Sequence, residues 1–150
     1  AYIVAVRLKN DQKYDQALEI IETVLQDYPN SSKRATWLST KADIHKRMQN
    51  WTEAEITYKQ SLSEGPDDYN TLVNLGLLYM EEMDNAVDAN QYFKKLIEIN
   101  PSNSFGYLLL AQSYEKLGEP DEAVQAYRNA LIVDPNNRTA QQAVDRLSVP

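Results

Sequence analysis

The stretch that decides the fold is residues 104–137, SFGYLLLAQSYEKLGEPDEAVQAYRNALIVDPNN. Its first half has an apolar face with the i, i+3, i+4, i+7 spacing of a helix, formed by Tyr107, Leu110, Ala111 and Tyr114. Gly118 can end that helix in the left-handed conformation, and Pro120 suits the first turn of another. The stretch therefore predicts two amphipathic helices joined by a tight turn.

The same pattern occurs three more times upstream. Alanines and helix-ending prolines share spacings of 37, 35 and 34 residues: Ala17, Ala54, Ala89, Ala123 and Pro29, Pro66, Pro101, Pro135. A bulky residue follows each alanine by four positions: Ile21, Tyr58, Phe93, Tyr127. A small residue occupies the matching place in each first helix: Ala5, Ala42, Gly76, Ala111. Small side chains allow two helix axes to approach closely, so the chain is predicted to be a helical repeat protein.

These motifs resemble the tetratricopeptide repeat (TPR), with an aromatic residue, Leu-Gly or Leu-Ala, and Tyr in one helix, then Ala, an aromatic residue, Ala and Pro in the next. The resemblance covers nearly the whole chain. It implies an all-α fold, a right-handed superhelical α-solenoid of antiparallel helix pairs. We expect one domain over 1–150, with repeats at about 1–31, 35–68, 69–103 and 104–137. A capping helix is expected at 138–148, or alternatively the start of a fifth repeat.

Two departures from the family pattern stand out. Lys41 and His45 occupy positions where Leu and Tyr are usual, and the third copy has one extra residue, which we place in the turn at 83–87. The expected helices cover 14–28, 34–48, 51–64, 69–82, 86–99 and the pair in 104–137. The spacing of Tyr58, Phe93, Tyr107 and Tyr127 assigns these aromatic residues to the core.

Composition narrows the function classes. The net charge of −7 disfavours nucleic acid, whose phosphates attract basic surfaces, and it lies mostly after residue 68. No apolar run approaches the ~20 residues of a membrane span, so direct membrane insertion is not expected. The absence of cysteine excludes disulfides and zinc–thiolate sites. The sequence begins inside a helix and reads as a fragment, so its compartment is unknown, with a cytoplasmic location slightly favoured.

Catalytic chemistry finds little support in the sequence. The only histidine, His45, has no partner at a spacing that would make it a general base. The four glycines are far apart and form no phosphate-binding loop, and the paired acidic residues do not share a helix face as metal ligands would. The chain is therefore predicted not to be an enzyme, and to need neither a cofactor nor a metal.

Surplus apolar residues on the first helices indicate a binding surface. Beside the core stripe of the third copy runs a second stripe at i, i+4, i+7: Val73, Leu77, Met80. A helix packed on one side does not need both stripes. If the chain forms a TPR superhelix, these positions line its concave groove. The predicted partner-binding residues are Lys46, Val73, Asn74, Leu77, Met80, Leu108 and Gln112. Leu109 fits the groove and the core equally well.

The predicted function is a non-catalytic scaffold that binds a peptide or helical segment of a partner protein in this groove. The clamp by which some TPR domains hold acidic chaperone tails is not expected, because Ser39, Asp43, Asn70 and Phe105 replace most of its Lys, Asn and Arg residues. Two alternatives remain. The chain could form homo-oligomers through the groove or through an exposed N-terminal end, or it could be an accessory interaction domain of a larger enzyme or of a secretion or assembly complex.

Overall fold

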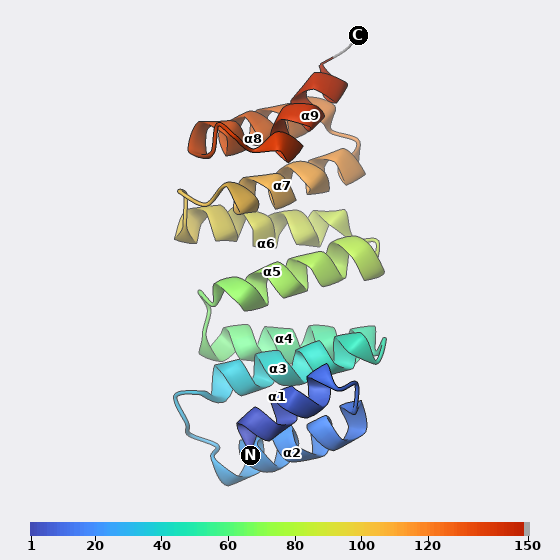
Figure 1. The fold of residues 1–150 in the computed structure, drawn as a ribbon, viewed down its shortest axis with the longest axis vertical. Coiled ribbons are helices and arrows are strands. Elements are labelled where there is room, and N and C mark those ends of the chain that lie inside the picture. The colour runs from blue at the N-terminus through green and yellow to red at the C-terminus, as the bar shows by residue number, and fades with distance from the viewer. Residues whose placement is uncertain (149–150) are drawn as a thin grey trace. The chain divides into compact units, whose positions relative to one another are not determined.

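A computed structural model describes residues 1–148, and the elements in this range are helices (Figure 1). This confirms the predicted fold class, an all-α arrangement of antiparallel helix pairs. The chain divides into two compact units, Ala1–Asn74 and Leu75–Pro150.

The first unit contains four helices and the start of a fifth. They are α1 (Tyr2–Asn10), α2 (Tyr14–Asp27), α3 (Arg34–Arg47), α4 (Trp51–Glu64) and the beginning of α5 (Tyr69–Leu77). Helix α1 packs on α2 and α3, while α3 packs on α2 and α4 (Figure 1). Their contact faces form a core whose largest members are Ile21, Val24, Leu25, Trp37, Leu38 and Ile44.

The second unit continues from the end of α5. It contains a π-helical turn, η1 (Leu78–Glu82), then α6 (Ala86–Ile99), α7 (Ser104–Leu117), α8 (Pro120–Val133) and α9 (Arg138–Leu147). Each of these elements packs on the next along the chain. Helix α9 is the predicted helix at 138–148, and it buries Ala140 and Ala143. Its role as a cap for the repeats stays a prediction.

The residues that define the repeat lie where the pattern predicts. The four helix alanines, Ala17, Ala54, Ala89 and Ala123, are fully buried. So are the bulky residues that follow them, among which Tyr127 is the most exposed at 2%. Tyr107 differs, because it is only partly buried. The shared spacing of alanines and bulky residues is therefore the spacing of the helix contacts.

The sequence pattern places the extra residue of the third copy in the turn at 83–87, and this prediction is wrong. The extra residue lies in the helix that precedes the turn. The turn residue Asp84 precedes Ala89 by five positions, as Gln12, Gln49 and Gly118 precede the alanines of their own repeats. The additional residue is taken up before the turn, where the backbone N–H of Met83 donates to the Leu78 carbonyl across five residues at 3.2 Å. A π-helical turn holds one more residue than an α-turn, so the connection keeps its shape.

Each of the four turns within a repeat contains one residue in the left-handed conformation, and only one of these four residues is glycine. The φ angles are 61° at Gln12, 61° at Gln49, 49° at Asp84 and 74° at Gly118. A side chain in this conformation costs about 1 kcal/mol or more. We expect Gly118→Ala to lower the free energy of unfolding by about 1 kcal/mol. Because no atom lies within 4 Å of the added Cβ, this loss would report backbone strain alone.

The matched variant is Gln49→Gly, which removes the same strain at the equivalent position of the second repeat. We expect a gain of about 0.5 kcal/mol, since glycine also makes the unfolded chain more flexible. Urea denaturation of both variants measures the two changes. If both substitutions changed the free energy of unfolding in the same direction, backbone strain at these two turn positions would not be the cause.

Candidate protein-interaction surfaces

The predicted partner-binding residues are divided between the two units. The first unit holds Lys46 on α3 with Val73 and Asn74 on α5, and the second holds Leu77, Met80, Leu108 and Gln112. Six of the seven are partly exposed, whereas Met80 is only 4% exposed. The role of these six residues in partner binding stays a prediction.

Met80 requires a correction, because its side chain belongs to the core. Its place in the outer stripe assumed an α-helical period from Val73 to Met80. The period breaks at Leu78, where the π-helical turn begins, so the side chains that follow point in different directions. The Met80 carbonyl accepts a hydrogen bond from Lys116 Nζ at 3.0 Å. Leu109 is also buried, at 3% exposure, which assigns it to packing.

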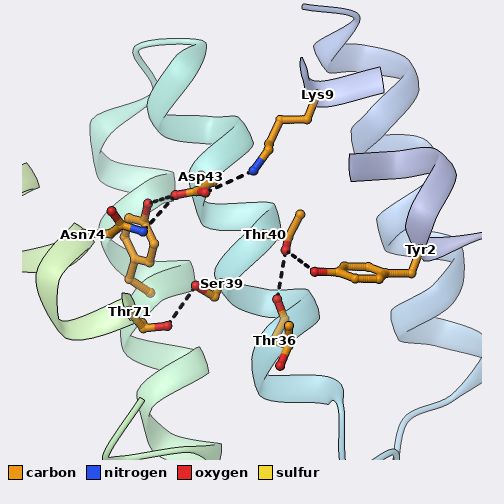
Figure 2. Close-up of polar contacts among 9 residues, drawn as sticks. Tyr2, Lys9, Thr36, Ser39, Thr40, Asp43, Thr71 and Asn74 are labelled. Atoms are coloured by element: carbon orange, nitrogen blue, oxygen red, sulfur yellow. Dashed lines mark hydrogen bonds and ion pairs between the residues drawn. The ribbon is translucent and has the colours of Figure 1, made fainter. Parts of the chain in front are cut away.

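In the first unit, Asp43 on α3 connects three other helices (Figure 2). Its Oδ2 accepts from Lys9 Nζ of α1 at 3.2 Å. Its Oδ1 accepts from the Tyr58 hydroxyl of α4 at 2.5 Å and from the Asn74 amide of α5 at 3.3 Å. Burial, together with the Asp43 charge and hydrogen bond, raises the pKa of Tyr58 well above its usual value. The tyrosine therefore acts as a fixed hydrogen-bond donor to the carboxylate.

Further hydroxyl contacts surround this network (Figure 2). Thr71 on α5 donates to Ser39 Oγ on α3 at 2.8 Å. The Tyr2 and Thr40 hydroxyl oxygens are 3.0 Å apart and share a hydrogen bond.

Two predicted partner-binding residues lie close to this network. The side-chain amide of Asn74 donates one of its hydrogens to Asp43. Lys46 forms no ion pair with any residue in the described part of the chain.

In the second unit, helices α7, α8 and α9 surround a surface hollow of about 440 Å³. We call it the α7–α9 hollow. Its lining residues are Gln112, Glu115, Tyr127, Thr139, Gln142, Ala143 and Arg146. Gln112 was predicted from the sequence, and Leu108 precedes it by one turn of α7. The hollow therefore contains part of the predicted second-unit surface.

Glu115 organises the α7–α9 hollow much as Asp43 organises the first unit. Its carboxylate accepts from the Tyr127 hydroxyl at 2.6 Å and from Arg146 Nη2 at 3.0 and 2.7 Å. Burial and the hydrogen bond to Glu115 raise the pKa of Tyr127. Each unit thus contains a core tyrosine, a carboxylate from the first helix of its repeat, and a cation from a further helix.

Sequence reasoning missed Glu115, Thr139, Gln142 and Arg146. Glu115 occupies the same position in the fourth repeat as Lys46, a predicted partner-binding residue, does in the second. With a 34-residue spacing, Gln142 and Arg146 correspond to Leu108 and Gln112. Aligning 138–148 as a further first helix would have identified both.

Two further kinds of feature, metal-ligand clusters and membrane-spanning helices, are absent from residues 1–148. Within 1–148, no three His, Asp or Glu side chains are grouped so that they could hold a metal ion. None of the helices in that range has the length and apolar character needed to cross a membrane.

Comparison with known proteins agrees with this architecture. Three family models described as tetratricopeptide repeat match residues 5–31, 39–104 and 104–137. Anaphase-promoting complex subunit 3 of Schizosaccharomyces pombe is 22% identical over 130 residues, 87% of this chain and 19% of that protein.

Two solved structures illustrate the likeness. The crystal structure of MamA gives a TM-score of 0.82 at 19% identity, covering 96% of this chain and 82% of that chain. The first TPR of Spaghetti (RPAP3), bound to the HSP90 peptide SRMEEVD, gives 0.69 at 20% identity, covering 79% and 93%. At such identities the structures establish the fold. The chain spans about a fifth of the curated relative. By its repeat models and its fold, the chain belongs to the tetratricopeptide repeat family.

Proposed function

We propose that this chain is a non-catalytic protein-interaction scaffold that binds an extended or helical segment of a partner protein. The observation that carries the proposal is the α7–α9 hollow, which is lined by amide, hydroxyl and paired charged groups beside the partly exposed Leu108. Such a surface can accept peptide backbone groups while an apolar partner side chain covers the leucine. Lys46 and Val73 offer a second contact surface in the first unit.

The charge arrangement favours an uncharged polar segment over an acidic one. Arg146 in the α7–α9 hollow is already paired with Glu115, and Lys9 in the first unit is paired with Asp43. The Spaghetti domain was solved with an acidic peptide, but here Lys9 and Arg146 have carboxylate partners within the chain, and only Lys46 of the predicted surface is a cation without an ion pair among residues 1–148. The net charge of −7 likewise disfavours nucleic acid, because its phosphates are negatively charged and are bound by basic surfaces.

Peptide selection followed by affinity measurement tests the proposal. Peptides would be selected on the wild-type chain from a displayed random library, and their Kd values measured by fluorescence polarisation. We expect Leu108→Lys to weaken binding about tenfold or more, which corresponds to about 1.4 kcal/mol. The control is Ile132→Lys, the same kind of change on α8 at a residue 77% exposed and outside the hollow. Equal binding by the two variants would refute the assigned surface.

A second candidate function is self-association through α1. Ile3 and Val4 on this helix are 82% and 49% exposed, an unusual placement for neighbouring large apolar residues. Light scattering over a concentration series would show a mass that rises for the wild type and stays monomeric for Ile3→Lys. A constant wild-type mass would exclude this candidate, whereas loss of association only in Leu77→Lys would place the contact in the second unit.

A further inference from the structure

Two ionisable residues lie on α3 at positions that are apolar or aromatic in the later repeats. By repeat register, Lys41 corresponds to Leu75 and Leu110, which are 0% and 9% exposed. His45 corresponds in the same way to Tyr79 and Tyr114. The two residues are one helical turn apart and so share a face of α3. In the first unit, a helix contact that is elsewhere built from Leu and Tyr therefore contains two titratable groups.

Lys41 has a partner in this contact. Its Nζ lies 2.7 Å from Glu22 Oε1 on α2, and its side chain is 23% exposed. A hollow of about 380 Å³ adjoins the pair, with Leu25, Arg34, Leu38 and Gln60 among its lining residues. The ion pair holds α3 to α2 without filling the space as tightly as a leucine side chain would.

His45 is in a different situation. Its Nδ1 is buried and has no hydrogen-bond partner among the described residues. The charges that act on the imidazole are Lys41 on its own helix, Glu53 on α4 and Glu22 on α2. In a neutral imidazole one nitrogen carries no proton, and that nitrogen can be buried without a hydrogen-bond partner at modest cost. An imidazolium carries an N–H on both nitrogens, and each N–H needs an acceptor. The surroundings therefore suit the neutral form.

We propose that His45 and Lys41 make the packing of α3 against α2 and α4 sensitive to pH, so that protonation of His45 loosens the first unit. The imidazolium would place an unpaired N–H in the contact and a second positive charge one turn from Lys41. Because α3 also carries Asp43 and Lys46, loosening would spread to the hydrogen-bond network and the contact surface of this unit. The inference concerns the stability of the first unit and does not depend on the proposed partner binding.

The direction of the pH dependence follows from burial. Burial first, and the Lys41 charge second, lower the pKa of His45 below its usual 6.5, against the opposing effects of Glu53 and Glu22. The unfolded chain then binds a proton more readily than the folded chain does. The stability associated with neutral His45 is therefore fully present above pH 6.5 and is lost as the pH falls through the folded-state pKa.

Because the sequence contains one histidine, a carbon–proton NMR titration of the imidazole follows this site alone. We expect a folded-state midpoint below 6.5, and a higher midpoint in Lys41→Met, where the nearby positive charge is removed. Hydrogen exchange should show α3 amides losing protection when the pH is lowered through that midpoint, after correction for the intrinsic exchange rate. A midpoint at or above 6.5 in the wild type would overturn the proposal without requiring any variant to fold.

A second measurement compares unfolding of the wild type with His45→Gln, which cannot be protonated, and with His45→Tyr, which has the residue of the later repeats. The wild type should lose stability between about pH 7.5 and pH 5 by more than either variant, because only the wild type titrates in this range at position 45. Parallel pH profiles in all three proteins would refute a role for His45. If one variant fails to fold, the other still supplies the comparison.

Discussion

Gly76→Ala is expected to lower the free energy of unfolding by about 3 kcal/mol, near the upper end of what overpacking costs. A Cβ at this position would lie 2.4 Å from Phe93 Cε1 and 2.9 Å from Phe93 Cζ. The Phe93 ring is fully buried on α6 and cannot swing into solvent to relieve the contact. The usual gain of about 1 kcal/mol from replacing a helical glycine with alanine is too small to offset this clash.

Gly106→Ala on α7 is the matched control. The nearest atom to its added Cβ is Ile97 Cγ1 at 3.4 Å, which is ordinary contact. We expect this variant to be as stable as the wild type or more stable by up to about 1 kcal/mol. Chemical denaturation of both variants gives the comparison. Similar stabilities would mean that the close approach of the helices at Gly76 does not restrict residue size.

Shortening the opposing side chain supplies an internal check. In the Gly76→Ala background, Phe93→Leu should cost less than it does in the wild type, because it makes room for the added methyl group. Residues in contact are expected to be non-additive in this way by about 0.5–3 kcal/mol. Strict additivity of the two substitutions would exclude the contact as the source of the loss.

The close contact at Gly76 is one of a set of helix contacts that occur in every repeat, and this repetition is why so much of the fold could be predicted. Helix contacts within a repeat recur at fixed positions, so the spacing of Ala17, Ala54, Ala89 and Ala123 revealed the helix pairs directly. Most predicted helix ends agree with the structure to within one residue, since the turns carry their own signals, such as Gly118 and Pro120. Local chemistry and repeat register point to the same boundaries.

The candidate site was less predictable, because it depends on which way a few side chains point. Met80 was misplaced because one inserted residue converts part of the helix to a π-turn, and sequence spacing does not reveal where an insertion is absorbed. Glu115 was missed because its importance comes from Tyr127 and Arg146, which lie 12 and 31 positions further along the chain. The repeat register can place Arg146 on a first helix, but the contact among the three side chains is made by tertiary packing, and sequence spacing does not reveal it.

Asp43→Ala is expected to destabilise the first unit by about 2–3 kcal/mol, since three donors lose their acceptor at once. The Tyr58 hydroxyl lies in the core and the Lys9 side chain is only 13% exposed, so solvent replaces these contacts poorly. The Asp43 side chain is 28% exposed, which keeps the loss below that of a fully buried ion pair. Urea denaturation, monitored by the fluorescence of Trp37 and Trp51 in this unit, measures the change.

The third repeat suggests how the loss can be reversed. At the positions of Tyr58 and Asp43 it has Phe93 and Leu77, an apolar pair without a hydroxyl or a carboxylate. We therefore expect Tyr58→Phe to cost about 1 kcal/mol in the wild type and almost nothing in an Asp43→Leu background, because the hydroxyl then has no acceptor to lose. Adding Lys9→Met should recover more, since the remaining unpaired ammonium is removed as well.

This series separates a structural role of Asp43 from a role in partner binding. If the carboxylate serves to hold α1, α4 and α5 against α3, the triple variant that combines Tyr58→Phe, Asp43→Leu and Lys9→Met should regain most of the lost stability, because it removes the carboxylate together with its hydroxyl and ammonium donors and leaves only the partly exposed Asn74 amide without that acceptor. If the three substitutions instead add their individual losses, the network is not the cooperative unit that its geometry indicates. A triple variant that is stable but no longer binds selected peptides would assign the carboxylate to the partner as well.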